Sequence, residues 1–221
     1  MKKTLFIVAA ALVAASTFAA TETNLTPEQV EANYTQAIEG RAADILKILS
    51  LSDTNKAAKV RDTIVAQYRS LHAWHDANDD KLKAAAKDTN AVAQIQASLK
   101  TLHNQFISKL SGNLTPAQVD AVKDKMTYGK VQVTYDAYNE IIPGLNDVQK
   151  ARILEWLKEA REEVMDCGSS KEKDAVFKKY KGKIANYLAK EGVNETKARK
   201  EWGEKQKAKT AAATTNSVPE K

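Results

Sequence analysis

The chain has 221 residues, of which 43% are hydrophobic and 28% charged, and a formal net charge of +6. This length is enough for one large or two small domains with a hydrophobic core, and we expect one. Residues 20–194 carry nearly equal numbers of basic and acidic side chains, which excludes a groove that gathers basic residues for nucleic acid. Cys167 is the only cysteine, which excludes an intramolecular disulfide, and we expect its thiol to be buried.

The first segment of the chain has the pattern of a secretory signal peptide. Two lysines precede an apolar run over residues 5–15, and small residues follow up to Ala19. The run is shorter than the roughly 20 apolar residues of a membrane helix, and no second such run follows. We therefore expect residues 1–19 to be removed by cleavage near Ala19. The mature protein is then periplasmic or secreted, with no membrane insertion after signal removal.

The next part of the chain predicts three helices. The first begins after Thr26, which forms a capping box with Gln29. A long second helix follows Asp53, and a third begins near Thr89. Because apolar residues keep helical spacing in both and the connection is short, we expect these two helices to form an antiparallel hairpin.

Further helix starts follow at Thr115, Asn146 and Ser169, each with Gln or Glu three positions later. A short polar helix is expected around Trp202, followed by a disordered polar tail over residues 204–221. The fold class is therefore all-α. We expect one domain over residues 20–203, an antiparallel bundle of about six to seven helices.

Residues 126–135 interrupt the helical pattern. Gly129 permits a turn, and Val131, Val133 and Tyr135 alternate as they would in an extended segment. We expect an irregular crossover that forms the wall of a pocket, since such backbone needs neighbouring groups to satisfy it.

Three tyrosines belong to this region, and their rings are suited to stacking on a sugar: Tyr128, Tyr135 and Tyr138. The alternative is a crossover loop whose tyrosines are half-buried packing residues. Either reading places aromatic side chains where the chain changes direction.

Several stretches together resemble an exported bacterial family known as domain of unknown function family 3826. They are residues 72–80, 126–129, 133–135, 156–157, 165–166, 168–170 and 179–184. The resemblance extends over most of the mature chain, to about Trp202. It implies an exported, mainly helical protein from bacteria that degrade complex glycans, and it implies no catalytic residues. The chain departs from the family pattern at Cys167, where a small residue is expected, and at Asn146, where Thr or Ser is expected.

The densest group of chemically active side chains lies at residues 72–80. On a helix His72 faces Asp76, and His75 faces Asp79, with Trp74 between the two histidines. His103 lies on the apolar face of the following helix, so it could approach His75 across the hairpin. The alternative is that both are core histidines satisfied by neighbours, and that the aspartates form a solvated helix end. The usual helical metal motifs are missing, so we expect no metal and no cofactor.

Three classes of function remain open. We favour a protein that binds a glycan-derived carbohydrate or another exported protein and performs no chemistry. The alternative is an enzyme acting on glycans through an acid/histidine cleft, with Asp76, Asp79, Asp166 and His72 as candidates. A second alternative is a periplasmic chaperone, because the Leu-Thr-x-x-Gln helix starts at residues 25–29 and 114–118 resemble those of periplasmic helical chaperones.

Overall fold

The structure is a computed structural model that describes residues 25–215, so the predicted signal peptide lies outside the described residues. The all-α fold is confirmed: the described residues form eight helices and no strand. The helices are α1 Pro27–Leu49, α2 Thr54–Ala84, α3 Thr89–Ser111, α4 Pro116–Met126, α5 Lys130–Ile141, α6 Asp147–Met165, α7 Ser170–Lys190 and α8 Glu195–Thr215. Among these eight, no helix combines the length and apolarity that crossing a membrane requires.

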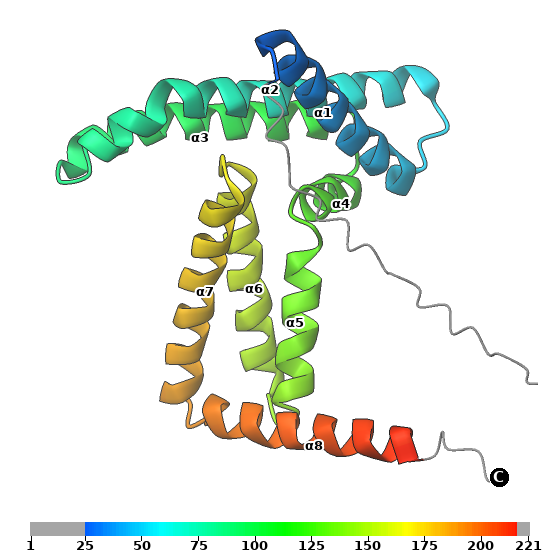
Figure 1. Ribbon diagram of the computed structural model, residues 1–221, viewed down its shortest axis with the longest axis vertical. Coiled ribbons are helices and arrows are strands. Elements are labelled where there is room, and N and C mark those ends of the chain that lie inside the picture. The colour runs from blue at the N-terminus through cyan, green and yellow to red at the C-terminus, as the bar shows by residue number, and fades with distance from the viewer. Residues whose placement is uncertain (1–24, 216–221) are drawn as a thin grey trace, which may run out of the picture.

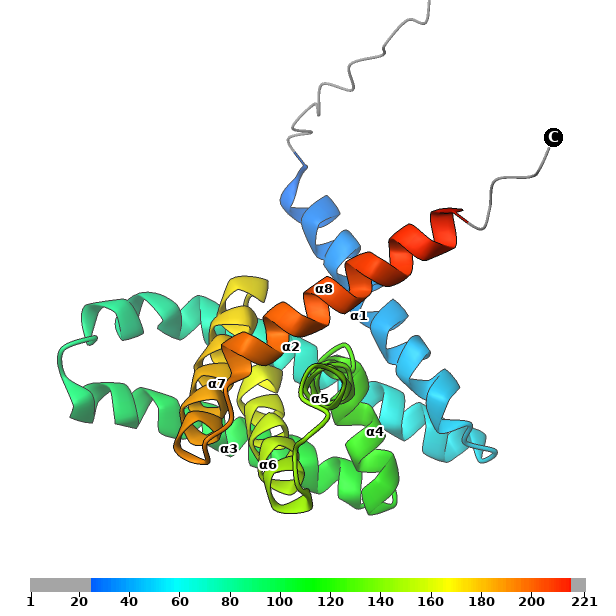
Figure 2. The ribbon, with the colours of Figure 1, turned by 90° about the horizontal axis from the view of Figure 1, so that it is seen from below.

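The helices form two levels. Helices α1, α2 and α3 make an upper level, in which α2 and α3 form the predicted antiparallel hairpin (Figure 1). Helices α5, α6 and α7 stand below this level, and α4 lies between the two (Figure 1). Helix α8 crosses the far end of the lower group and contacts α5 and α7 (Figure 2).

Each level has its own buried core. The upper core contains apolar residues of α1 to α4, including Ile45, Ile64 and Leu110, each exposed by 1% or less. The lower core is built by α5, α6 and α7 around Leu157 and Leu188, which are fully buried. Met165, at the end of α6, belongs to the upper core. The two levels are thus in direct contact where α6 ends.

The prediction for residues 126–135 is wrong in its main part. Only the turn over residues 127–129 is non-helical, and α5 begins at Lys130. Val131, Tyr135 and Tyr138 are spaced as on one helix face, and they contact the lower core. Val131, Val133 and Tyr135 do alternate, but Val131 and Tyr135 also share the helical period with Tyr138, and Val133 is 68% exposed. Burial against α6 selects the helix.

The C-terminal end of the fold also differs from the prediction. Instead of ending near Trp202, α8 continues to Thr215, through the first part of the predicted disordered tail. Trp202 packs against the lower core, and its Nε1 donates a hydrogen bond of 3.0 Å to Glu140 Oε1. Gln206 donates to the same oxygen at 3.0 Å, so two turns of this polar helix are attached to α5.

Candidate functional site

The turn between α4 and α5 holds Tyr128 in an unusual backbone conformation. Its φ is +59°, in the left-handed region, and its side chain is 67% exposed. The Gly129 N–H donates to the Asp124 carbonyl at 2.8 Å and the Tyr128 N–H to the Lys125 carbonyl at 3.2 Å. These two bonds form a Schellman motif, in which the left-handed position is usually glycine. Here a tyrosine occupies that position, at a steric cost that no core contact of its ring explains.

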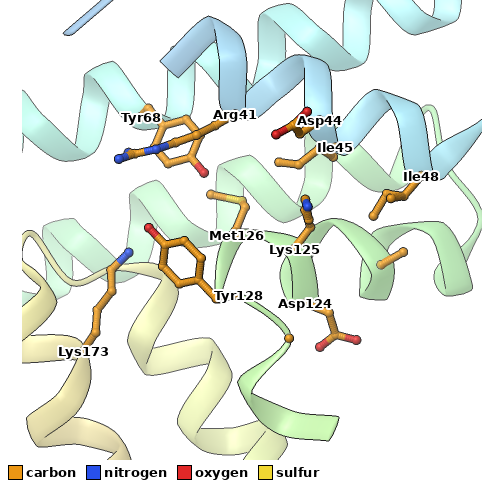
Figure 3. A pocket seen from close by; sticks show the side chains of 12 residues that line it. Arg41, Asp44, Ile45, Ile48, Tyr68, Asp124, Lys125, Met126, Tyr128 and Lys173 are labelled. Atoms are coloured by element: carbon orange, nitrogen blue, oxygen red, sulfur yellow. The ribbon is translucent and has the colours of Figure 1, made fainter. Parts of the chain in front are cut away.

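Tyr128 lies at the edge of a cavity of about 750 Å³. This volume is within the range of about 300–1,000 Å³ that small-molecule sites usually have. Figure 3 shows that Tyr128, Tyr68 of α2 and Lys173 of α7 point toward the same space. The remaining lining is partly charged and partly apolar: Arg41, Asp44, Ile45, Ile48, Ala121, Asp124, Lys125, Met126 and Gly129.

A second, smaller cavity of about 120 Å³ adjoins the first and shares Arg41, Tyr68, Met126 and Lys173 with it. It extends to His72, His75 and Cys167. We refer to the two adjoining cavities together as the Tyr128 groove. The structure thus places two separately predicted groups, Tyr128 and the histidines of α2, along one groove.

The exposed wall of the smaller cavity is aromatic. The rings of His72 and Tyr34 lie 4.7 Å apart between centroids, and the Tyr34 hydroxyl donates to the Tyr68 carbonyl at 2.8 Å. His72 Nε2 lies 3.5 Å from Asp76, and both of these side chains are more than half exposed. Burial raises the pKa of Tyr68 to about 12, so its hydroxyl stays protonated and able to donate a hydrogen bond.

The contacts of His75 indicate a structural role. Its Nδ1 lies 2.8 Å from Asp79 and its Nε2 lies 2.8 Å from the Asp166 carbonyl. Both partners are acceptors, so the ring donates from both nitrogens when it is protonated. Burial lowers the pKa of His75, but the hydrogen bonds to Asp166 and Asp79 outweigh it and the pKa is raised. Gly168 lies against this ring, because a Cβ there would be only 2.7 Å from the ring.

His103 of α3 also contacts residues at the C-terminal end of α6. Its Nδ1 lies 3.0 Å from the Asp166 carboxylate and its Nε2 lies 3.5 Å from Glu162. The hydrogen bonds to Asp166 and Glu162 raise the pKa of His103 to about 9. His75 and His103 therefore meet at one residue, Asp166, and together attach the hairpin of α2 and α3 to the end of α6.

An acid/histidine cleft of about 910 Å³ lies between α3 and the α6 and α7 pair. Its carboxylates are engaged: Asp166 with His103, Glu162 with Lys123 at 2.8 Å, and Glu163 with Lys179 at 2.7 Å. Although burial alone would raise the pKa of Glu162, His103 and Lys123 hold it at about 2. Within residues 25–215, no group of three or more His, Cys, Asp or Glu is arranged to hold a metal ion.

The other predicted residues lie away from the Tyr128 groove. Tyr135 and Tyr138 face the lower core, and burial raises the pKa of Tyr138 to about 12. Trp74 donates from Nε1 to Ser98 Oγ at 2.8 Å and so joins α2 to α3. Cys167, by contrast, lines the smaller cavity; it is partly buried, and burial raises the pKa of its thiol to about 11.

The sequence does not single out several residues of the groove, among them Arg41, Tyr68 and Lys173. They come from α1, α2 and α7, and no local motif connects them. Tyr68 has the spacing of a core residue, and Lys173 is one of many lysines in α7. Only the tertiary arrangement of the helices brings the three side chains together.

We expect the stability of the protein to fall as the pH rises from about 6.5 to 9. Because the folded-state pKa of His103 is about 9, above its ordinary value of 6.5, the charged ring stabilises the fold fully below pH 6.5 and not above pH 9. Melting temperatures measured between pH 6 and 10 test this. His103→Gln should flatten the slope, whereas an unchanged slope in that variant would show that His103 does not cause it.

Comparison with known proteins identifies the family but not an activity. No curated protein matches the chain. A model of the family described as "Protein of unknown function (DUF3826)" matches residues 35–208, which include all residues that line the main cavity and all but Tyr34 of those that line the smaller one. The chain therefore belongs to the DUF3826 family of proteins of unknown function.

Proposed function

We propose that this protein binds a carbohydrate-derived ligand in the Tyr128 groove and performs no chemistry on it. The observation that carries the proposal is Tyr128 itself. A large aromatic ring is held 67% exposed beside a cavity, on a backbone position that favours glycine. Left-handed backbone at a bulky residue costs on the order of 1–3 kcal/mol and is usually found where function requires it.

The lining of the groove suits a sugar. An exposed tyrosine ring offers an apolar face for the C–H groups of a pyranose, and its hydroxyl can exchange hydrogen bonds with the ligand. Tyr68 lies on the same cavity, together with charged side chains that can bind ring hydroxyls. A mostly apolar cavity with a few orienting polar groups is the usual form of a small-molecule site.

The alternatives fit the geometry less well. A glycan-cleaving enzyme needs one carboxyl group that is protonated and one that is free to act. Of the candidate acids, Asp76 lies against His72, Asp79 against His75 and Asp166 against His103. Glu162 and Glu163, in the acid/histidine cleft, are also held in ion pairs. A chaperone would favour one large exposed apolar surface. The large exposed apolar residues of the described chain are instead spread over several elements: Leu25, Val30, Ile48, Tyr128, Val133 and Val148.

Export is part of this proposal and rests on the sequence of residues 1–19. A periplasmic or secreted protein meets oligosaccharides released outside the cytoplasm. Another exported protein is the alternative partner, and a binding screen without any saccharide hit would favour it.

The test is binding of defined oligosaccharides to the mature protein by isothermal titration calorimetry, after a thermal-shift screen of neutral and acidic sugars. Tyr128→Ala should weaken the binding about tenfold or more and leave the helical circular dichroism unchanged. Val133→Ala is the matched control, because Val133 is 68% exposed and lies one helical turn beyond the groove. Unchanged affinity in Tyr128→Ala would contradict the proposal.

A further inference from the structure

Arg41 differs from every other arginine of the protein. All six arginines of the sequence lie in the described part of the chain. Five of them have a carboxylate oxygen within 2.6–2.8 Å: Arg61, Arg69, Arg152, Arg161 and Arg199. Arg41 has no such partner, and its guanidinium lies over the ring of Tyr68, 5.5 Å from the centroid. An arginine stacked in this way still presents its N–H edge to an incoming anion.

Lys173 is the second cation of the groove without a carboxylate partner. It is partly buried on α7, and its Nζ lies 5.9 Å from the centroid of the Tyr128 ring. Other lysines around α7 do form ion pairs, such as Lys179 with Glu163 and Lys130 with Asp174. Lys173 thus faces the groove as an uncompensated charge.

The acidic residues on the lining do not neutralise these two cations. Asp44 is paired with Lys47 at 2.9 Å, and Asp124 is paired with Arg161 at 2.7 Å. Lys125, on the same lining, adds a further positive charge. Among the described residues, Arg41 and Lys173 are therefore cations of the main cavity that have no carboxylate as ion-pair partner.

We propose that the ligand is an anionic saccharide, whose carboxylate or sulfate group binds Arg41 and Lys173 while a sugar ring stacks on Tyr128. This rests on the proposed function and specifies its ligand class. Arginine and lysine bind such oxygens through charge-assisted hydrogen bonds, and the guanidinium can do so with two parallel bonds. The stacked position of Arg41 on Tyr68 orders its side chain before the ligand arrives, which reduces the entropy lost on binding.

The test compares ligands that differ only in charge. Calorimetry at constant ionic strength would measure binding of α-1,4-linked trigalacturonate and of α-1,4-linked galactotriose, in which each carboxylate is replaced by CH₂OH. A second pair, a 4-sulfated chondroitin disaccharide and its unsulfated form, which keeps its carboxylate, tests the sulfate separately. We expect at least about tenfold tighter binding of the more highly charged member in one pair, since a charge-assisted hydrogen bond contributes about 1.5–3 kcal/mol.

The variants Arg41→Gln and Lys173→Gln should each reduce this preference, and the double variant should abolish it. Arg61→Gln and Lys171→Gln are matched controls, because they remove one positive charge each from α2 and α7 away from the groove and should leave the preference unchanged. A preference that persists in the double variant would overturn the inference.

The two proposals fail in different ways. Equal binding of the two members of each pair, lost in Tyr128→Ala, would keep the proposed function and overturn the anionic ligand. Absence of binding for both members of both pairs, together with an empty screen of other saccharides, would overturn the proposed function and this inference with it.

Discussion

Replacing Tyr128 with glycine is expected to increase the free energy of unfolding by about 0.5–1 kcal/mol, while it weakens saccharide binding about tenfold or more. Tyr128 has a φ of +59° at the Schellman position, where a side chain with a Cβ is strained. Glycine relieves that strain at the cost of greater chain entropy in the unfolded state. Binding is lost because the stacking ring is removed.

Ser50→Gly is the control for this substitution. Ser50 is the other non-glycine residue with positive φ in residues 25–215, at +47°, and it ends α1 outside the groove lining. It should gain stability by a similar or smaller amount and bind ligand like the wild type. Urea unfolding and calorimetry on the same samples separate the two effects. A large loss of stability in Tyr128→Gly would show that the ring supports the fold rather than a ligand.

Arg161→Ala is expected to reduce the free energy of unfolding by about 3 kcal/mol. Arg161 of α6 is 3% exposed, and it binds Asp124 at 2.7 Å and Asp120 at 2.8 Å, both on α4. It also contacts Glu162 at 3.2 Å. This loss of unfolding free energy is at the lower end of the range expected when a buried ion pair loses one partner, because water can still reach the carboxylates that remain.

The control for Arg161 is Arg152→Ala, on the same helix. Arg152 pairs with Glu155 at 2.6 Å on the surface, and such an exposed pair contributes less than about 1 kcal/mol. Urea denaturation followed by circular dichroism measures both variants. If Arg161→Ala cost no more than Arg152→Ala, the ion pairs between Arg161 and α4 would not be an important source of stability.

The helix starts were predictable because their signals are local. The capping boxes expected at Thr26, Thr115, Asn146 and Ser169 all form, with reciprocal hydrogen bonds between the capping side chain and the residue three positions later. A capping box depends on four consecutive residues and needs no tertiary contact. The α2 and α3 hairpin followed from the same local reasoning.

The positions of His75 and His103 on the helix faces indicated that the two side chains could come close together. The residue that both of them contact could not be predicted. Both histidines bind Asp166, which belongs to the end of α6 and lies 63 residues beyond His103. Sequence spacing within the hairpin indicated that the two rings are close. The residue that holds them comes from the other level of the fold, and no pattern in the sequence connects it to them.

The lower level shows where local patterns become ambiguous. Residues 131–138 satisfy both an alternating and a helical spacing, and only packing against α6 selects the helix. α8 has a weak apolar pattern, and its length depends on the contacts of Trp202 and Gln206 with Glu140. In the groove, Tyr128 was identified from the turn, whereas Arg41, Tyr68 and Lys173 depend on tertiary contacts.

The most direct test of the account is an NMR titration of the mature protein with trigalacturonate, following the backbone amides and the arginine Nε–Hε signals. With only six arginines in the sequence, the signal of Arg41 can be assigned by substitution. We expect the Arg41 Nε–Hε signal and the Gly129 amide to shift most, with smaller changes elsewhere along the Tyr128 groove. Largest shifts around His103 and Glu162 in the acid/histidine cleft, or no shifts at all, would contradict it.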